Sequence, residues 1–334
     1  MEVFVFMNSK VSAEGLAERI GRWEAIGVTG VLVPDHFFFA RDGQRSVETV
    51  QPDPFVVLAA VGAMSTRLKV GTMVANTSLV HPAWIVRHLA ELAFLYGGDR
   101  VIAGFGAGWN GEEFDALGME MPSYRQRIER LGEALEVAVQ CFQHGTATLA
   151  GGSVTVRDLP MSIGSGGPPR ILVGGGSDAL LECAARYADH VDLNGSSRRM
   201  KLGRVQVSSA EGVRRLTTTI DDLEASVGRL NQLLDATQRE ASSVKHSVLL
   251  DSVEFCDRAD VVGRQEALKV RRGVGDVRVN ECPYVLIGTS DDIVEALAER
   301  EGRLGLSAVL VFDGQHLEVL MSEVLPRLTA TVDS

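Results

Sequence analysis

One stretch of the chain combines glycine, aromatic and acidic residues in a pattern suited to holding a ligand. Three glycines spaced by two follow an apolar run and are followed by an aromatic residue and a pair of acids: Gly104, Gly106, Gly108, Trp109, Glu112 and Glu113. Glycines at a strand end let the backbone turn sharply and approach a planar or anionic ligand, because no Cβ intervenes. The same spacing also fits a tight turn into helix packing, and the pattern alone leaves both interpretations open.

A second glycine run is typical of an anion site. The residues Gly174 to Ser177 lie between an apolar strand pattern and a helix pattern. Backbone N–H groups and the positive end of a helix attract an anion at such a position. A flexible strand-to-helix turn is the alternative, but three consecutive glycines exceed what a turn needs. The run therefore favours phosphate binding.

An acid and an imidazole stand side by side at the end of the second apolar run, as Asp35 and His36. Imidazole titrates near neutral pH, and a neighbouring carboxylate can tune it for proton transfer. The alternative is a capping or turn pair, because Pro34-Asp35 is typical of turns. The position favours general acid–base chemistry.

Charge and cysteine content exclude several classes of protein. The formal net charge of -11 disfavours a nucleic-acid partner, which requires a basic face. Four cysteines far apart predict neither a zinc site nor a disulfide framework, and they suit a reducing cytoplasm. The other histidines lack metal-ligand spacing, and no apolar run is long enough to span a membrane. The basic cluster at 198–204 fits a solvated surface, or alternatively a contact with an anionic cofactor tail.

Strand-like and helix-like segments alternate about eight times along the chain. Clear helix patterns follow strand patterns at 12–27, 54–64, 82–96, 123–142, 178–187, 217–239, 291–300 and 317–328. The strands are continuous apolar runs, as expected when helices cover them. We therefore predict an α/β fold, a single (β/α)8 barrel over residues 1–330, with insertions after strands 4 and 7. The first insertion contains a hairpin at 146–156. The second contains the segment 254–280, whose pattern is the weakest in the chain and is interpreted as a helix followed by a disordered or lid-like loop.

Several motifs, taken in order, resemble one known family. They are Val-Pro-Asp-His-Phe at 33–37, Gly-Thr-Met-Val-Ala-Asn with His-Pro at 71–82, Gly-Phe-Gly-Ala-Gly-Trp-Asn-Gly-Glu-Glu-Phe at 104–114, Tyr-Arg-Gln-Arg at 124–127, Val-Gly-Gly-Gly-Ser at 173–177, and Ile-Gly-Thr-Ser at 287–290. The chain resembles the luciferase-like monooxygenase superfamily, and it is most similar to the branch that uses the deazaflavin coenzyme F420. The resemblance covers nearly the whole chain to about residue 328.

The resemblance implies a role for each motif. A bulge with a non-prolyl cis peptide after the third strand is expected to back the cofactor ring, in the segment Met73, Val74, Ala75 and Asn76. Two loops are expected to bind the cofactor, the first along its ring and tail and the second at its phosphate: Gly106, Ala107, Gly108 and Trp109, then Gly174, Gly175, Gly176 and Ser177. Asp35 and His36 match the acid–histidine motif beside the reactive ring carbon. Glu113 is the second candidate proton donor, with Glu112 as its alternative.

These expectations define a function. The chain is predicted to be a cytoplasmic F420-dependent oxidoreductase that moves a hydride between the deazaflavin and a small organic substrate, with the cofactor carrying the redox chemistry. An FMN-dependent monooxygenase supplied by a partner flavin reductase is the runner-up, and a non-catalytic flavin-binding protein is the alternative from another class. Families of this kind are usually homodimers, and no metal, nucleic acid or membrane is expected.

Overall fold

Eight parallel strands close into a barrel in the computed structural model, which describes residues 1–39, 45–194, 215–275 and 277–330. In barrel order they are β1 (Glu2–Phe6), β2 (Gly30–Val33), β3 (Lys69–Thr72) continued by β4 (Ala75–Asn76), β5 (Val101–Gly106), β8 (Arg170–Gly175), β9 (His190–Leu193), β10 (Lys245–Leu249) and β13 (Leu306–Phe312). Pairing of β13 with β1 and of β3 with β5 completes the closure. The predicted barrel is confirmed.

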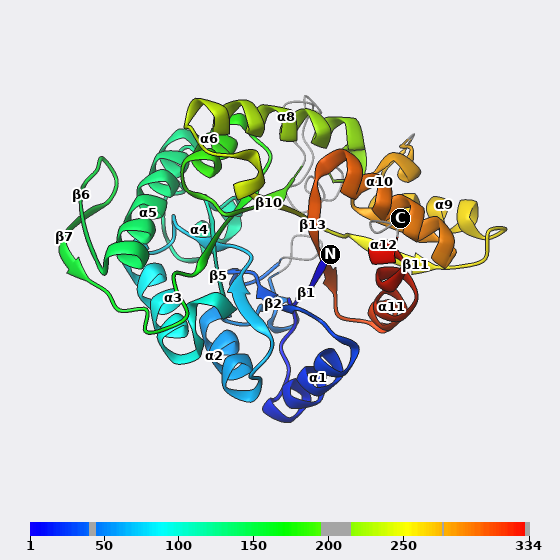
Figure 1. Cartoon of the computed structure of the whole chain (residues 1–334), viewed down its shortest axis with the longest axis horizontal. Helices are drawn as coiled ribbons and strands as arrows, with labels where there is room; N and C mark the ends of the chain where they lie inside the picture. Colours follow the sequence, from blue (N-terminus) through cyan, green and yellow to red (C-terminus); the bar gives the residue numbers. More distant parts are fainter. Residues whose placement is uncertain (40–44, 195–214, 276, 331–334) are drawn as a thin grey trace.

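Helices form a ring around these strands (Figure 1). They are α1 (Ala13–Ile26), α2 (Pro54–Met64), α3 (Pro82–Tyr96), α5 (Tyr124–His144), α6 (Asp178–Tyr187), α8 (Ile220–Ala236), α10 (Ser290–Leu304), α11 (Gln315–Val319) and α12 (Leu325–Ala330), the last two joined by the π-helical turn η6 (Leu320–Val324). Local chemistry sets their ends as predicted for α1. Ser12 caps its first turn by accepting the Gly15 N–H, and Gly27 ends it at φ 83°, where a side chain is strained.

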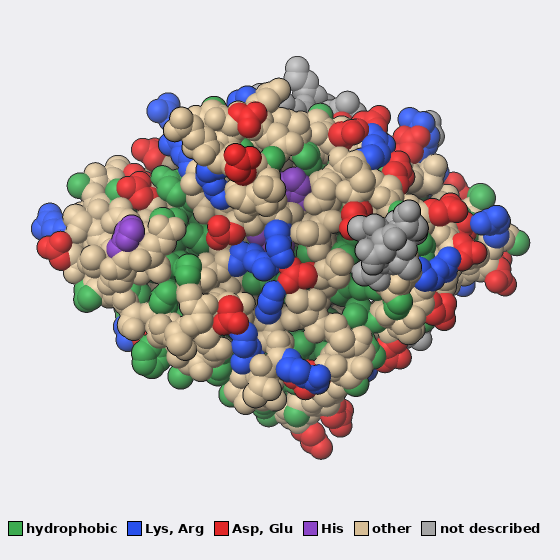
Figure 2. All heavy atoms as spheres, in the orientation of Figure 1, with side chains coloured by type: hydrophobic (Ala, Val, Ile, Leu, Met, Phe, Trp, Pro, Cys, Tyr) green, Lys and Arg blue, Asp and Glu red, His purple; other side chains and the backbone are tan. Residues whose placement is uncertain are grey.

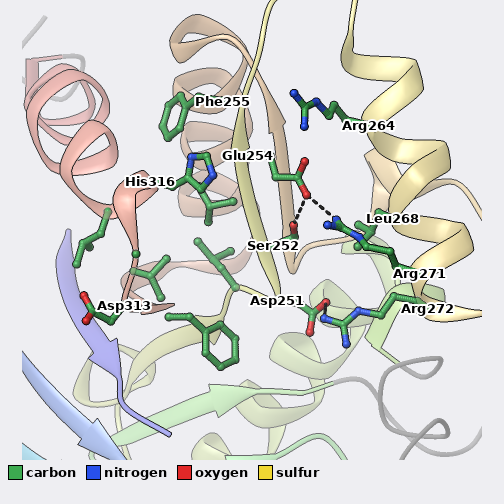
Figure 3. A pocket seen from close by; sticks show the side chains of 16 residues that line it. Asp251, Ser252, Glu254, Phe255, Arg264, Leu268, Arg271, Arg272, Asp313 and His316 are labelled. Carbon is green, nitrogen blue, oxygen red and sulfur yellow. Dashed lines mark hydrogen bonds and ion pairs between the residues drawn. The ribbon is translucent and has the colours of Figure 1, made fainter. Parts of the chain in front are cut away.

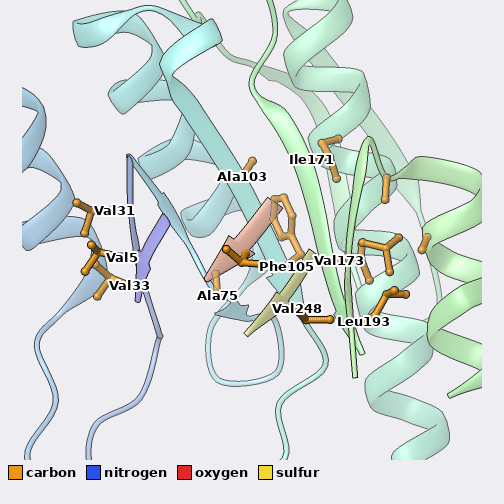
Figure 4. Close-up of a cluster of buried hydrophobic side chains, with 14 of the residues drawn as sticks. Val5, Val31, Val33, Ala75, Ala103, Phe105, Ile171, Val173, Leu193 and Val248 are labelled. Atoms are coloured by element: carbon orange, nitrogen blue, oxygen red, sulfur yellow. The ribbon is translucent and has the colours of Figure 1, made fainter. Parts of the chain in front are cut away.

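Alternation along each strand separates two apolar layers. Phe4 and Phe6 of β1 point inward and join Leu32, Ile102, Leu172, Ala308 and Leu310 in the barrel interior. Val3 and Val5 belong to the larger cluster between strands and helices. Figure 4 shows part of this outer layer, with Val5, Val31, Val33, Phe105 and Val173 on strands from neighbouring parts of the barrel. The inner layer fills the barrel, so a ligand can bind only at an end.

A network of ion pairs lies at the amino-terminal end of the barrel. Glu2 forms ion pairs with Lys69 (2.7 Å), Arg170 (3.0 Å) and Lys245 (3.1 Å), each from a different strand. Burial alone would raise the pKa of Glu2, but the Lys69 and Arg170 cations lower it to about 2. Figure 2 shows basic and acidic side chains together at the centre of the face where Figure 1 marks the N-terminus. This network occupies the end opposite to the carboxyl ends of the strands.

Both predicted insertions are present. The first carries α4 (Gly111–Ala116) and, beyond α5, the antiparallel hairpin of β6 (Thr146–Ala150) and β7 (Thr155–Pro160), at the left of Figure 1. The second contains β11 (Ser252–Phe255), α9 (Val261–Arg272), the 3-10 turn η5 (Val279–Glu281) and β12 (Val285–Gly288).

The sequence interpretation of the second insertion needs correction. The expected helix within 254–280 is present as α9, but β11 also forms a separate two-stranded parallel sheet with β12, outside the barrel, which the sequence did not predict. The pairing partner lies about 33 residues away in sequence, and a four-residue strand with mixed polarity gives no signal without it. The basic cluster at 198–204 lies outside the described residues.

Candidate active site

The end of the third strand is wedged against two neighbouring strands. A cis peptide joins Met73 to Val74, within the segment where a non-prolyl cis bond was expected. A Cβ on Gly106 of β5 would lie 2.3 Å from Val74 Cγ2, and one on Gly174 of β8 would lie 3.4 Å from Val74 Cγ1. The Val74 side chain therefore fills the space over both glycines, at the carboxyl end of the barrel.

The three spaced glycines are explained by this packing. A Cβ on Gly104 would lie 1.9 Å from the Thr72 carbonyl oxygen. One on Gly108, at φ +76°, would lie 2.3 Å from Asn76 Oδ1. Protein atoms from the third strand occupy the space that a side chain would need. The space over these glycines is taken by the third strand and the segment after it, which presents Val74 and Asn76 at the mouth.

His36 and Glu113 form the best-defined polar pair at the mouth. His36 follows β2, and Glu113 lies in the first turn of α4, whose start Asn110 caps. Glu113 Oε2 lies 3.0 Å from His36 Nδ1, and Oε1 accepts the Phe37 N–H at 2.6 Å. The Glu113 side chain is fully buried, whereas His36 is 13% exposed. A carboxylate oxygen at this distance can accept an N–H from Nδ1, which leaves Nε2 to exchange a proton with a ligand.

This geometry changes the expected role of Glu113. Both of its oxygens are engaged within the protein, and no part of the side chain reaches solvent. A carboxylate so placed fixes the tautomer and direction of the imidazole. Glu113, predicted from the resemblance to be a second proton donor, is therefore better suited to act through His36.

Asp35 connects the second strand to the third. Its Oδ2 accepts the Asn76 N–H at 2.9 Å. Burial raises the pKa of Asp35, while the Asn76 N–H and the nearby His36 oppose the shift. Asp35 and His36 therefore have different roles. The Asp35 carboxyl group binds the backbone at the end of β4, and the His36 imidazole faces the mouth.

Aromatic rings surround the imidazole. The Phe39 ring centre lies 4.5 Å from that of His36, and the Trp109 ring centre lies 5.5 Å away in an edge-to-face arrangement. Trp109 remains 41% exposed. An exposed tryptophan beside a half-hidden histidine forms an apolar wall on which a planar ligand can rest. The sequence predicted Trp109 here, but nothing singled out Phe39.

The second glycine run meets the start of α5. Ser177 caps α6 by accepting the Leu180 N–H, and its hydroxyl is hydrogen-bonded to the Tyr124 hydroxyl at 2.5 Å. Arg127 lies under the Tyr124 ring and donates from Nε to the Gly108 carbonyl at 3.1 Å. One line of contacts thus runs from the first glycine loop, through Arg127 and Tyr124, to Gly174–Ser177. The sequence showed Tyr124 and Arg127 only as part of the Tyr-Arg-Gln-Arg motif at 124–127 and gave no sign of these contacts.

The residues at this mouth fit a flavin-type cofactor. Asn76 Nδ2 is a buried donor without an acceptor, in a residue whose Oδ1 accepts the Ser78 N–H. A carbonyl-bearing ring over Val74 would offer such a donor a partner.

Across the described ranges, no group of three or more His, Cys, Asp or Glu side chains is arranged to hold a metal. None of the helices in the described part of the chain is long and apolar enough to cross a bilayer.

A separate cleft opens beside the ends of β10 and β13 (Figure 3). It has a volume of about 840 Å³, and β11, α9 and α11 form its walls. Three arginines of α9 line it: Arg264, Arg271 and Arg272. Their spacing with Leu268 is a helical stripe, and it lies within the segment 254–280 for which the sequence predicts a helix followed by a loop.

Comparisons with known proteins agree with this architecture. Residues 1–307 match the family model described as luciferase-like monooxygenase. An F420-dependent glucose-6-phosphate dehydrogenase of Microbacterium testaceum is 25% identical over 321 residues, covering 91% of this chain and 90% of that protein. The same-named protein of Kribbella flavida is 26% identical over 223 residues, and the match covers 64% of this chain and 65% of that protein, just under two thirds of its length.

A solved structure of an F420-dependent secondary alcohol dehydrogenase in complex with an F420-acetone adduct superimposes with a TM-score of 0.75. It is 16% identical, and the match covers 98% of both chains. At this identity the likeness establishes the fold alone.

Proposed function

The chain belongs to the luciferase-like monooxygenase family, and from that premise we propose that it is an F420-dependent oxidoreductase acting on a small organic substrate. The similarity to two F420-dependent glucose-6-phosphate dehydrogenases supports the choice of cofactor. The bound deazaflavin would supply the hydride chemistry. The observation that carries the proposal is the imidazole of His36, held at Nδ1 by a buried carboxylate with Nε2 directed away from it.

The protein's own groups would bind, orient and exchange a proton. Val74 and Trp109 would support the ring, and Asn76 Nδ2 would donate to a ring carbonyl. The segment Gly174–Ser177, where β8 ends and α6 begins, would hold the phosphate, with Tyr124 and Arg127 beside it. His36 Nε2 would accept a proton from an alcohol as it is oxidised, or donate one in the reverse direction.

Cofactor identity is tested by titrating the purified apo-protein with F420 and with FMN while following fluorescence quenching. We expect F420 to bind with micromolar or tighter affinity and FMN far more weakly. Binding of FMN without F420 would make the chain an FMN-dependent enzyme instead.

The catalytic role is tested by His36→Ala. Removing a general acid or base lowers kcat by about 100-fold or more, while F420 affinity should stay within a few-fold. His88→Ala on α3, which also removes a ring in tilted contact with a phenylalanine, is the matched control and should retain full turnover. Equal turnover of both variants would remove His36 from the reaction.

The assembly is proposed to be a homodimer of chains that each act as one domain over residues 1–330. Apolar side chains on α2 and α3 are exposed, among them Val56 (69%), Trp84 (54%) and Leu95 (61%). A second copy covering this face would remove them from water. Sedimentation of the wild type and of Trp84→Glu tests the assembly, since a charge in the interface should yield monomers.

A further inference from the structure

The cleft beside β10 and β13 carries arginines that the proposed proton chemistry does not use. α9 presents Arg264, Leu268 and Arg271 at intervals of four and three residues, so they share one helix face. Figure 3 shows the three arginines of α9 on one side of the cleft and Phe255 and His316 on the other. Leu268 is buried between the charges and anchors the helix.

The acids that line the cleft are already paired. Asp251 accepts from Arg272 at 2.7 Å, and Glu254 accepts from Arg271 at 2.7 Å and from the Ser252 hydroxyl at 3.2 Å. Asp313 accepts the Trp23 indole N–H and forms ion pairs with Arg19 and Arg22 of α1. The acidic groups therefore have little capacity left for a ligand cation.

Arg264 is the unmatched charge. Within the described ranges no carboxylate lies within ion-pair distance of its guanidinium, although it lines the same cleft as Glu254. Arg271 gives one nitrogen to Glu254, and a guanidinium has five N–H donors, so further donors remain on it. The lining carries three arginines and three carboxylates, and each carboxylate already has an arginine partner, so the donors left for a ligand are those of Arg264 and the remaining ones of Arg271.

The cleft adjoins the barrel mouth. Phe312, at the end of β13, lines the cleft and packs edge to face on Phe6 with ring centres 5.3 Å apart. Phe6 pairs in register with Leu32 of β2, the strand that leads to Asp35 and His36. A ligand in the cleft can therefore extend over Phe312 toward the mouth, with an aromatic surface formed by stacked Phe255 and His316 at its other side.

We propose that Arg264 and Arg271 form an oxyanion subsite for the substrate, so that the enzyme acts on small molecules bearing a phosphate or carboxylate group. Paired N–H groups of arginine match such groups in geometry and charge. The anion would lie between α9 and β11, and the reacting carbon would extend toward the mouth. This inference rests on the proposed function for its link to turnover, but not for anion binding itself.

Anion binding is measured first, by calorimetric titration of the full-length chain with inorganic phosphate. We expect saturable binding that weakens by about tenfold or more in Arg264→Gln and is partly restored in Arg264→Lys. Arg258→Gln is the matched control, because Arg258 is 78% exposed, belongs to the same insertion and does not line the cleft. No phosphate binding, or equal binding by the Arg264→Gln and wild-type proteins, would overturn the subsite.

Turnover then separates the substrate from other sources of anionic charge. With F420 as cofactor, Arg264→Gln should raise the KM for glucose 6-phosphate by about tenfold with kcat nearly unchanged, and leave the KM for glucose unaffected. A parallel loss of F420 affinity would mean that the cleft holds the cofactor's acidic tail, which contradicts the proposal. Failure of F420 to bind the wild type would defeat the proposed function, while the phosphate titration would still decide the subsite.

Discussion

Two parts of the barrel's carboxyl end are built on opposite principles. Around β2, β4, β5 and β8, backbone and small side chains meet so closely that a methyl group has no room at Gly104 or Gly106. In the insertion after β10, the cleft of about 840 Å³ is lined by long charged side chains. There, no atom lies within 4 Å of a Cβ added at Gly263 or Gly273.

On the proposed function, this difference would separate recognition of an invariant ligand, the cofactor, from recognition of a variable one, the substrate. A packed wall presents His36, Val74 and Asn76 in fixed positions, as a shared cofactor requires. Long arginines in an open cleft can be exchanged without disturbing the barrel, since few contacts depend on them. The packed side would therefore define the chemistry and the open side the substrate.

The strongest test of the packed side is Gly104→Ala. The added methyl would meet the Thr72 carbonyl oxygen at 1.9 Å and force β3 and β5 apart. We expect a loss of at least about 3 kcal/mol in the free energy of unfolding, measured by urea denaturation, or no folded protein at all. A variant as stable as the wild type would show that β3 and β5 can move apart to accommodate the methyl group, contrary to this packing.

Asp192 tests the boundary between the two parts. It is fully buried on β9, level with Gly174 on one side and Ser247 on the other, and it accepts the Ser247 hydroxyl at 2.9 Å. Burial raises its pKa to about 7, against the Ser247 hydrogen bond and the Arg215 charge.

The sign of the effect follows from proton binding. Below about pH 4 both the folded and unfolded states hold this proton; between there and pH 7 only the folded state does, so stability falls as pH rises. From pH 5 to 7 the wild type should lose about 2–3 kcal/mol more than Asp192→Asn in urea denaturation. Identical pH profiles would mean that Asp192 is ionised in the fold.

Glu113→Gln sharpens the role of the packed side in catalysis. The amide can no longer fix the Nδ1–H tautomer of His36 as a carboxylate does, so kcat should fall by about tenfold with F420 affinity retained. Glu120→Gln, at an exposed position shortly after α4, is the control and should not change kcat. If kcat fell in Glu112→Gln and not in Glu113→Gln, the residue that supports His36 would be Glu112 and not Glu113.

The smallest effect is expected on the open side, for Gly263→Ala. This residue lies inside α9, and an added Cβ meets no atom within 4 Å. Alanine should stabilise the helix by about 0.5–1 kcal/mol without altering turnover. Thermal unfolding would detect it, and a destabilised protein would indicate that α9 packs more closely than the structure shows.

The sequence predicted the packed side better than the open one. Glycine spacing, the Asp35-His36 pair and the helix caps are local signals, and the structure places these residues at strand and helix ends. The caps at Ser12 and Gly27 and the bounds of α2, α3 and α6 agree with the patterns. The expected bulge at 73–75 contains the cis peptide. β11 could not be predicted, because its pairing partner is remote and its own polarity is mixed.

Sequence by itself determined the alternation of strands and helices, and with it the barrel and the edge at which strand-end residues gather. Hydrophobic period and capping chemistry act over a few residues, so they can be read along the chain. Tertiary structure decided which partners these residues have. It made Glu113 a support for His36, explained the glycines by Thr72, Val74 and Asn76, and brought the arginines of α9 opposite β11, because contacts between distant segments exist only once the barrel closes.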